Sequence, residues 1–279
     1  MGAAQTEISP HVFDYIRRLV YQHSRISLNH DKMDLVNARL ARRLRQLRLA
    51  SLEEYYHLLR SPAGAEETGP LLDIISTNHT RFFREAQHLE FLSNAILPEM
   101  VGATSLTRPF RLWCAACSSG EEPYSLAIVL SEYFRQVAES TWKIEASDIS
   151  KRMLEHARAG IYEAERVELP APELLSRYFQ RGVGTFEGQY RIKRDVRKKI
   201  EFYRVNLFQP RYPFLSGLHT IFCRNVMIYF DLETQQHLIP RLTDLLLPGG
   251  YLIVGASESL LPFEHRLHYV RPSIYQKLS

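Results

Sequence analysis

The chain has 279 residues, of which 45% are hydrophobic and 24% are charged, a composition typical of a folded protein with at most two domains. Disordered, collagen-like and fibrous classes are therefore excluded, and no apolar run reaches the ~18 residues that a membrane-spanning helix needs. The net charge of +4 is too small to require nucleic acid as a partner.

The N-terminus and the cysteines bear on the cellular compartment. No uninterrupted apolar block follows Arg17 and Arg18, so we expect no secretory signal. The first six residues fit the short myristoylation pattern that begins at Gly2, but this pattern is degenerate. Three cysteines without an export signal favour a reducing compartment over a disulfide framework. We expect a cytoplasmic protein.

Residues 1–75 are predicted to form an all-helical domain. Within Asp31–Arg48, apolar side chains recur every three or four residues and make one stripe of an amphipathic helix. Five arginines lie on the same helix: Arg39, Arg42, Arg43, Arg45 and Arg48. At 100° per residue, Arg42 and Arg45 point away from the stripe. A turn at residues 61–65 separates this region from a further helix that starts at Thr68.

Residues 76–107 are expected to form a linker that contributes to a site, because residues 78–85 mix aromatics and arginines without a clean period. From residue 108, short apolar runs alternate with helical patterns, which predicts an α/β domain with a doubly wound parallel sheet at 108–279. The expected strands are 110–115, 142–147, 200–205, 218–223 and 251–255. A glycine-punctuated stretch at about 181–199 is expected to be a small antiparallel insertion.

The segment Trp113–Ser125 predicts a strand, a turn of small residues around Gly120, and a helix. In doubly wound sheets ligands bind beyond the carboxyl ends of strands, where small residues allow close backbone approach. Glu121 and Glu122 oppose a pyrophosphate and favour a cationic ligand, such as the amine and sulfonium of S-adenosylmethionine. Alternatively, both carboxylates only support the helix N-terminus.

Cys114 and Cys117 have the spacing of some redox and zinc motifs. A zinc site needs a second pair of ligands, and Cys223 is the only other thiol in the chain. Small buried side chains explain these cysteines better, so we expect no metal.

Polar residues follow the later strands. Asp148 lies 28 residues after Gly120, where an acidic side chain can accept both hydroxyls of a ribose. Alternatively, Asp148 or Ser150 caps the next helix. Asn206 suits an adenine edge. Arg224 directly follows a buried strand, a position where an arginine often meets an anion, here the substrate.

Taken together, four segments resemble those of the CheR-type chemotaxis receptor methyltransferases: Asn78–Glu85, Ser118–Ser125, Ala146–Ile149 and Phe222–Asp231. The resemblance spans nearly the whole chain. It implies a Rossmann-like, S-adenosylmethionine-dependent methyltransferase sheet with a helical N-terminal domain and a β insertion. It also implies methyl transfer to glutamate side chains of a bacterial chemoreceptor or a receptor-like signalling protein, leaving methyl esters and S-adenosylhomocysteine.

By this resemblance the cofactor site contains Asn78, Thr80, Arg84, Glu121, Asp148, Asn206, Leu207, Arg224 and Asn225. The motif does not decide whether Glu121 or Glu122 makes the contact. The residues expected to face the methyl group and the incoming glutamate are Arg84, Arg224 and Tyr229.

The implied partner is the cytoplasmic helical bundle of a methyl-accepting chemoreceptor. Its acidic faces would meet the five arginines at 39–48, unless these form only a solvated surface. In some family members the insertion also binds a peptide at the receptor's C-terminus. We expect a monomer that binds no nucleic acid. Two other interpretations stay open: an RNA or DNA methyltransferase, and a non-catalytic sensor that binds S-adenosylmethionine.

Overall fold

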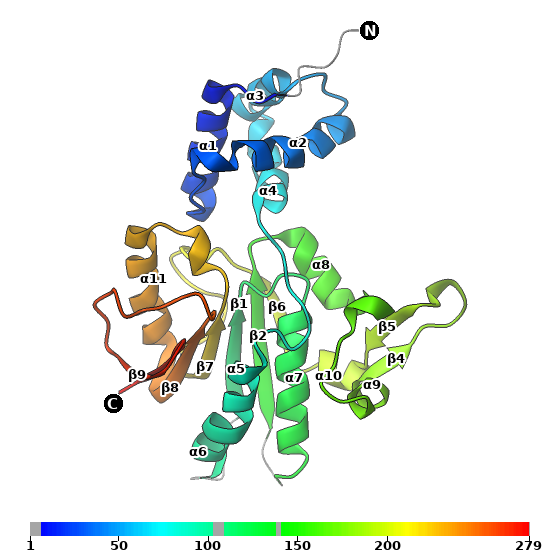
Figure 1. Cartoon of the computed structure of the whole chain (residues 1–279), viewed down its shortest axis with the longest axis vertical. Helices are drawn as coiled ribbons and strands as arrows, with labels where there is room; N and C mark the ends of the chain where they lie inside the picture. The colour runs from blue at the N-terminus through cyan, green and yellow to red at the C-terminus, as the bar shows by residue number, and fades with distance from the viewer. Residues whose placement is uncertain (1–6, 103–108, 138–140, 279) are drawn as a thin grey trace.

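The computed structural model describes residues 7–102, 109–137 and 141–278. A helical domain lies at one end of the molecule, over the carboxyl ends of the strands of an α/β domain (Figure 1). The myristoylation pattern falls at residues 1–6, outside the described residues. Within the described ranges, no helix has both the length and the apolarity needed to cross a membrane.

Residues 10–75 are helical, as predicted, and have a hydrophobic core of their own. Of the predicted stripe, Val36, Leu40 and Leu44 are buried in this core. The last helix begins at Gly64 rather than Thr68, where the chain passes so close to the preceding helix that a Cβ would lie 2.1 Å from the Leu59 carbonyl oxygen. The elements are α1 (Pro10–Ser24), η1 (His30–Lys32), α2 (Met33–Leu47), α3 (Leu52–Arg60) and α4 (Gly64–Ile75).

Within the described part of the expected linker, residues 77–81 have no regular secondary structure and residues 82–85 form a turn. Most of the remainder forms α5 (Ala86–Phe91), the π-helical segment η2 (Leu92–Ile96) and α6 (Leu97–Gly102). Leu92, Ile96 and Leu97 are fully buried in the same core as the first strand. This part of the expected linker therefore belongs structurally to the α/β domain.

The main sheet has seven strands in the order β6-β2-β1-β7-β8-β10-β9. All five predicted strands are present and pair in parallel, which confirms the predicted fold class. The two strands after them pair antiparallel at one edge and were not predicted. The bounds are β1 (Phe110–Ala115), β2 (Trp142–Asp148), β6 (Ile200–Arg204), β7 (Leu218–Cys223), β8 (Leu246–Val254), β9 (Leu267–Arg271) and β10 (Ile274–Lys277).

Helices cover both faces of this sheet (Figure 1). Side chains of β1 therefore alternate between two cores: Leu112 and Cys114 pack into one, Trp113 and Ala115 into the other. The covering helices are α7 (Glu121–Phe134), α8 (Lys151–Ala159) and α11 (Leu232–Leu245), and η5 (Met227–Tyr229) precedes the last of these. All three cysteines are buried and free, as expected, and burial raises the pKa of each thiol well above its usual range.

The antiparallel insertion is larger than predicted, because its first strand lies at 161–163, before the glycine-rich stretch. It projects from the α/β domain beyond α10 (Figure 1). The strand order is β3-β5-β4, which leaves one edge of β4 unpaired within this sheet. The elements are β3 (Ile161–Glu163), η3 (Ala164–Arg166), α9 (Glu173–Tyr178), β4 (Phe179–Arg181), η4 (Gly184–Phe186), β5 (Gln189–Ile192) and α10 (Arg194–Arg197).

Candidate active site

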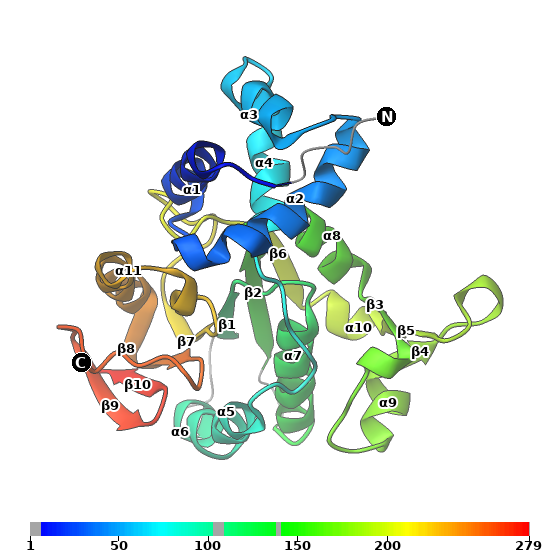
Figure 2. The same cartoon turned by 45° about the horizontal axis from the view of Figure 1, so that its top comes forward.

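The loops that follow β1, β2, β6 and β7 enclose a cavity of about 830 Å³, part of it open to solvent. It lies where the strand order reverses, the usual ligand site of an open α/β sheet. In Figure 2, α2 and the chain that leaves α4 lie over these strand ends. The helical domain and this connecting chain complete the wall with Ser24, Ile26, Ser76, Thr77 and His79.

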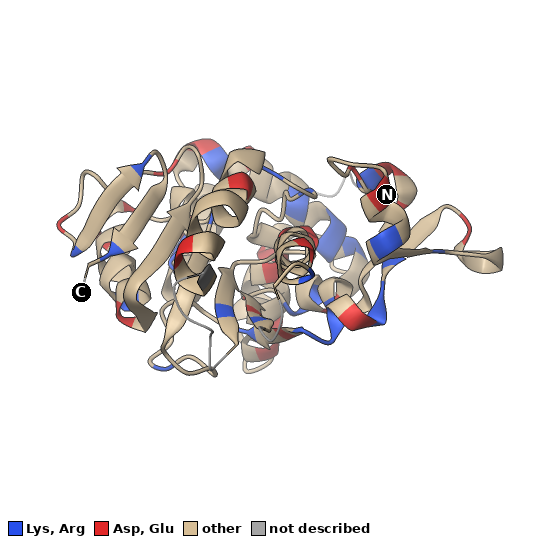
Figure 3. Cartoon of the chain, turned by 90° about the horizontal axis from the view of Figure 1, so that it is seen from below, with Lys and Arg blue, Asp and Glu red and all other residues tan. Residues whose placement is uncertain are grey.

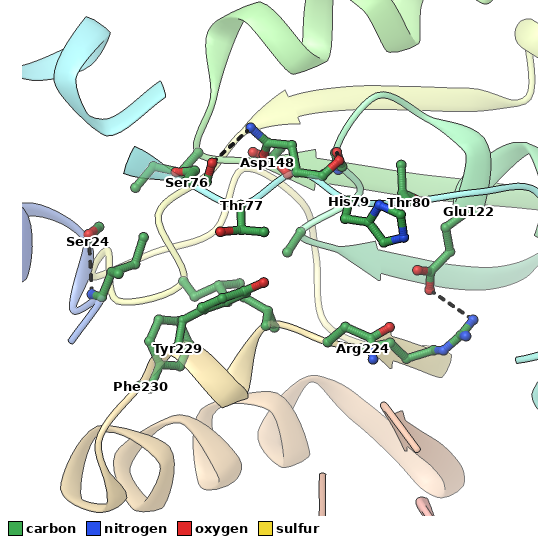
Figure 4. Close-up of a pocket in the computed structure, with 18 of the residues that line it drawn as sticks. Ser24, Ser76, Thr77, His79, Thr80, Glu122, Asp148, Arg224, Tyr229 and Phe230 are labelled. Carbon is green, nitrogen blue, oxygen red and sulfur yellow. Dashed lines mark hydrogen bonds and ion pairs between the residues drawn. The ribbon is translucent and has the colours of Figure 1, made fainter. Parts of the chain in front are cut away.

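Asp148, at the end of β2, lies in the cavity wall with 7% of its surface exposed (Figure 4). One carboxylate oxygen accepts the Ser118 amide and the other accepts the Ser150 amide, each at 2.8 Å. The helix cap considered for Asp148 is provided by Ser150, whose hydroxyl accepts the Met153 amide. Burial raises the pKa of Asp148 to about 6, although the two amides favour its ionised form. Each oxygen retains a lone pair for a further donor.

Glu121 and Glu122, which follow the turn after β1, have different surroundings. Glu122 lines the cavity, whereas Glu121 does not. Glu121 is fully buried and points toward the insertion, where it accepts the Ser119 hydroxyl at 2.6 Å and pairs with Arg166. Of the two carboxylates that the motif left open, Glu122 is therefore the one in position for a ligand, and burial raises its pKa. Gly120 is required at this turn, because a Cβ there would lie 2.7 Å from the Tyr162 hydroxyl.

Arg224, directly after β7, lines the cavity but is only 3% exposed. Its Nη2 donates to the Arg84 carbonyl at 2.6 Å and to Glu85 at 3.1 Å. Its Nη1 lies 3.5 Å from Glu122, the ion pair drawn in Figure 4. Most of the guanidinium is thus already bound by groups of this chain.

Glu85 was not singled out from the sequence, although it lies in one of the four family-like segments. It also accepts the Asn225 side-chain amide at 3.1 Å and the Ala256 amide at 3.0 Å. Burial opposes ionisation of this carboxyl, but the Asn225 bond and the Arg224 charge outweigh burial and lower its pKa. His88 lies 3.3 Å away; burial and the Arg224 charge lower its pKa to about 4, so it is neutral at physiological pH.

Arg84 and Tyr229 line the same cavity and are less enclosed. The Arg84 side chain is 26% exposed, and its Nη1 donates to the His79 carbonyl at 2.9 Å. The Tyr229 ring lies along the cavity wall (Figure 4), and its carbonyl accepts the Ser27 amide from the helical domain at 2.8 Å.

The other expected cofactor residues also line the cavity: Asn78, Thr80, Asn206, Leu207 and Asn225. The Asn206 side chain is already engaged, since it donates to the His23 carbonyl at 2.6 Å and accepts the Phe208 amide at 2.9 Å. It thus joins the two domains, and few of its polar groups remain for an adenine edge.

The structure divides the five arginines, four on α2 and Arg48 directly after it, into two groups. Arg43 forms a two-pronged ion pair with Glu67 at 2.6 and 2.8 Å, inside the helical domain. Arg39 donates to the Ile75 carbonyl and to the Thr77 hydroxyl, at the cavity wall. Both arginines therefore already have partners within the chain, and their docking of a receptor stays a prediction. The exposed members are Arg42, Arg45 and Arg48.

The acceptor groups of this cavity fit S-adenosylmethionine. Asp148 retains acceptor positions suited to a ribose, and Glu122 Oε1, 3.5 Å from Arg224, accepts no hydrogen bond from any described residue. Acidic groups at the switch point of a doubly wound sheet suit both the ribose and the cationic end of this cofactor, as in an S-adenosylmethionine-dependent methyltransferase.

Comparison with known proteins gives the family. Residues 78–275 match the family described as "CheR methyltransferase, SAM binding domain", and residues 11–75 match "CheR methyltransferase, all-alpha domain". The chain belongs to the CheR methyltransferase family, and its cofactor is S-adenosylmethionine.

Relatives of similar length support this assignment. The chemotaxis protein methyltransferase of Escherichia coli K12 is 39% identical over 263 residues, which cover 94% of this chain and 89% of the relative. Chemotaxis protein methyltransferase 2 of Pseudomonas aeruginosa is 41% identical over 265 residues, covering 94% and 91%. The chemotaxis protein methyltransferase of Borreliella burgdorferi is 36% identical over 263 residues, which cover 93% of this chain and 92% of the relative.

Proposed function

We propose that this methyltransferase esterifies glutamate side chains on the cytoplasmic helical bundle of a bacterial chemoreceptor, or of a receptor-like signalling protein, and leaves S-adenosylhomocysteine. The relatives named as chemotaxis protein methyltransferases support the signalling context. One observation carries the choice of acceptor: an incompletely enclosed guanidinium, Arg84, shares the cavity wall with the phenol of Tyr229. Such a pair suits an anionic carboxylate.

The chemistry needs no general base. A glutamate carboxyl with an ordinary pKa of about 4.3 is already ionised at neutral pH. When bound, S-adenosylmethionine supplies an electrophilic methyl group on a sulfonium. The task of the protein is to align the acceptor oxygen, and such alignment is worth up to roughly 7–11 kcal/mol.

Burial divides the roles among the candidate residues. Arg84 and Tyr229 orient the acceptor carboxylate, because both reach the cavity and neither side chain is fully enclosed. Arg224 holds Glu85 and Glu122 in place, since its guanidinium is already bound to them. Asp148 accepts the ribose hydroxyls, and Glu122, rather than Glu121, faces the cationic end of the cofactor. Asn78, Thr80, Leu207 and Asn225 complete the walls.

The receptor docks on the exposed arginines of α2 and the residue directly after it, namely Arg42, Arg45 and Arg48. They extend from a helix that lies across the cavity end of the sheet (Figure 2), so an acidic helix bound there would present its glutamates near the cavity. The unpaired edge of β4 suits a strand-like peptide from the receptor's C-terminus. Titration of such a peptide against the full chain tests this contact.

A nucleic-acid substrate is the alternative within the same class. Figure 3, which views the chain from below, shows basic and acidic segments interspersed along the described chain. A net charge of +4 likewise offers little attraction for a polyanion. A protein acceptor is therefore the better fit.

The acceptor is tested by the stability of the product. The full chain is incubated with S-adenosylmethionine carrying a tritiated methyl group and with receptor-containing membranes, and the labelled material is then treated with mild base. Release of the label as volatile methanol identifies carboxyl esters. Base-stable label, or label transferred to added RNA or DNA, would contradict the proposal, and so would binding of the cofactor without any transfer.

A further inference from the structure

The loop after β7, residues 224–230, contains five of the residues that line the cavity, yet this loop is not part of the sheet. Its second residue, Asn225, has a left-handed backbone with φ of 56°, a conformation that asparagine adopts more readily than most residues other than glycine. The loop makes specific contacts with residues from elsewhere in the chain.

Those contacts come from Glu258, on the segment after β8. One of its carboxylate oxygens accepts the Asn225 amide at 2.8 Å and the Gly255 amide at 2.6 Å, and the other accepts the Ile228 amide at 3.2 Å. Glu258 is only 7% exposed and does not line the cavity. A single buried carboxylate thus ties both ends of residues 225–228 to the end of β8.

The packing around this carboxylate leaves little room for another arrangement. A Cβ at Gly255 would lie 2.5 Å from the Asn225 side-chain nitrogen and 2.8 Å from Glu258. Glu85 accepts two further bonds here, from the Asn225 side-chain amide and from the Ala256 amide. The loop is therefore held between two carboxylates, one of which, Glu258, contacts it solely through backbone amides.

We propose that Glu258 is a positioning residue for methyl transfer: its carboxylate sets the backbone of residues 225–228 and thereby places Arg224, Asn225 and Tyr229 in the cavity wall. A glutamine cannot replace it, because its NH₂ group would face a backbone N–H in either orientation. The inference rests on the proposed location of the cofactor site.

The test compares Glu258→Gln with Glu264→Gln, a matched change at an exposed glutamate on the same segment. Binding of S-adenosylhomocysteine is measured by calorimetry, and kcat and the receptor KM by methyl transfer. Glu258→Gln should weaken binding about tenfold or more and lower kcat by a similar factor, while the receptor KM stays within about twofold because the docking arginines are elsewhere. A folded Glu258→Gln chain with parental binding and kcat would overturn the proposal.

A second measurement applies even if Glu258→Gln does not fold. In the parent protein, the amides of Asn225, Ile228 and Gly255 should exchange slowly with deuterium, and Glu258→Asp should accelerate that exchange selectively. Rapid exchange of these amides in the parent would also overturn the proposal. Asp148→Asn separates this failure from an error in the site itself: parental binding in that variant would mean that the cofactor binds elsewhere.

Discussion

Substitution of Asp148 by asparagine should weaken binding of S-adenosylhomocysteine and remove most of its dependence on pH. The carboxylate accepts two buried amides and retains positions for ribose hydroxyls, so the variant loses charge-assisted bonds. Hydrogen bonds to charged groups contribute about 1.5–3 kcal/mol, which corresponds to roughly 10- to 150-fold in Kd.

The pH dependence follows from the raised pKa of Asp148, about 6 in the absence of cofactor. If the ionised form binds the ribose, roughly one tenth of the protein is competent near pH 5, and affinity falls about tenfold relative to neutral pH. Folding shows the opposite trend. Because the folded pKa lies above the unfolded value, the folded state binds more protons between about pH 4 and pH 6, and the unfolding free energy decreases as pH rises through that window.

Both trends are measurable on the same samples. Calorimetric titration at about pH 5, 6 and 7.5 gives Kd, and thermal unfolding over the same range gives stability. Asp195→Asn is a matched control, since the Asp195 side chain is 87% exposed. Equal pH slopes for the parent and Asp148→Asn, or a Kd changed by less than about twofold, would refute the assigned role.

Three further predictions follow from the arginines. Arg43→Ala should lower the unfolding free energy by about 2–3 kcal/mol, because it leaves the buried Glu67 without its cation, whereas Arg45→Ala should stay within about 0.5 kcal/mol in the same denaturant titration. Arg84→Ala should reduce kcat at least tenfold with a nearly unchanged melting temperature, and kinetics at the parental level would remove Arg84 from the mechanism. Reversal of charge at Arg42 and Arg45 should raise the receptor KM and flatten its salt dependence, and an unchanged salt profile would argue against docking on α2.

The strands and the cavity could be predicted because their signals are local. The apolar runs of β2, β6 and β7 end in or near polar residues that line the cavity, namely Asp148, Asn206 and Arg224, and parallel strands bring those ends together. The exposure of Arg42 and Arg45 likewise follows from helical geometry alone. The start of the insertion was missed because β3 has only three residues and becomes a strand only by pairing with β5.

The remaining differences between the sequence predictions and the structure depend on residues that are far apart in the chain. Glu121 and Glu122 are adjacent at a helix start, and only their distant partners, Arg166 and Arg224, decide which of them faces the cavity. Arg43 is bound internally because Glu67, on another helix, is packed beside it. No sequence motif marks Glu258, because its partners are backbone amides, which almost any residue type can provide.

The cavity wall includes residues from both sides of the division between the two matched family regions, which end at residue 75 and begin at residue 78. Ser76 and Thr77 lie in the gap, Ser24 and Ile26 belong to the helical part, and Asn206 is bonded to the last turn of α1. A shortened chain starting at residue 78 would thus lack one side of the cavity. Binding of the cofactor in that cavity and packing of the helical domain against the sheet should consequently be thermodynamically linked, each stabilising the other.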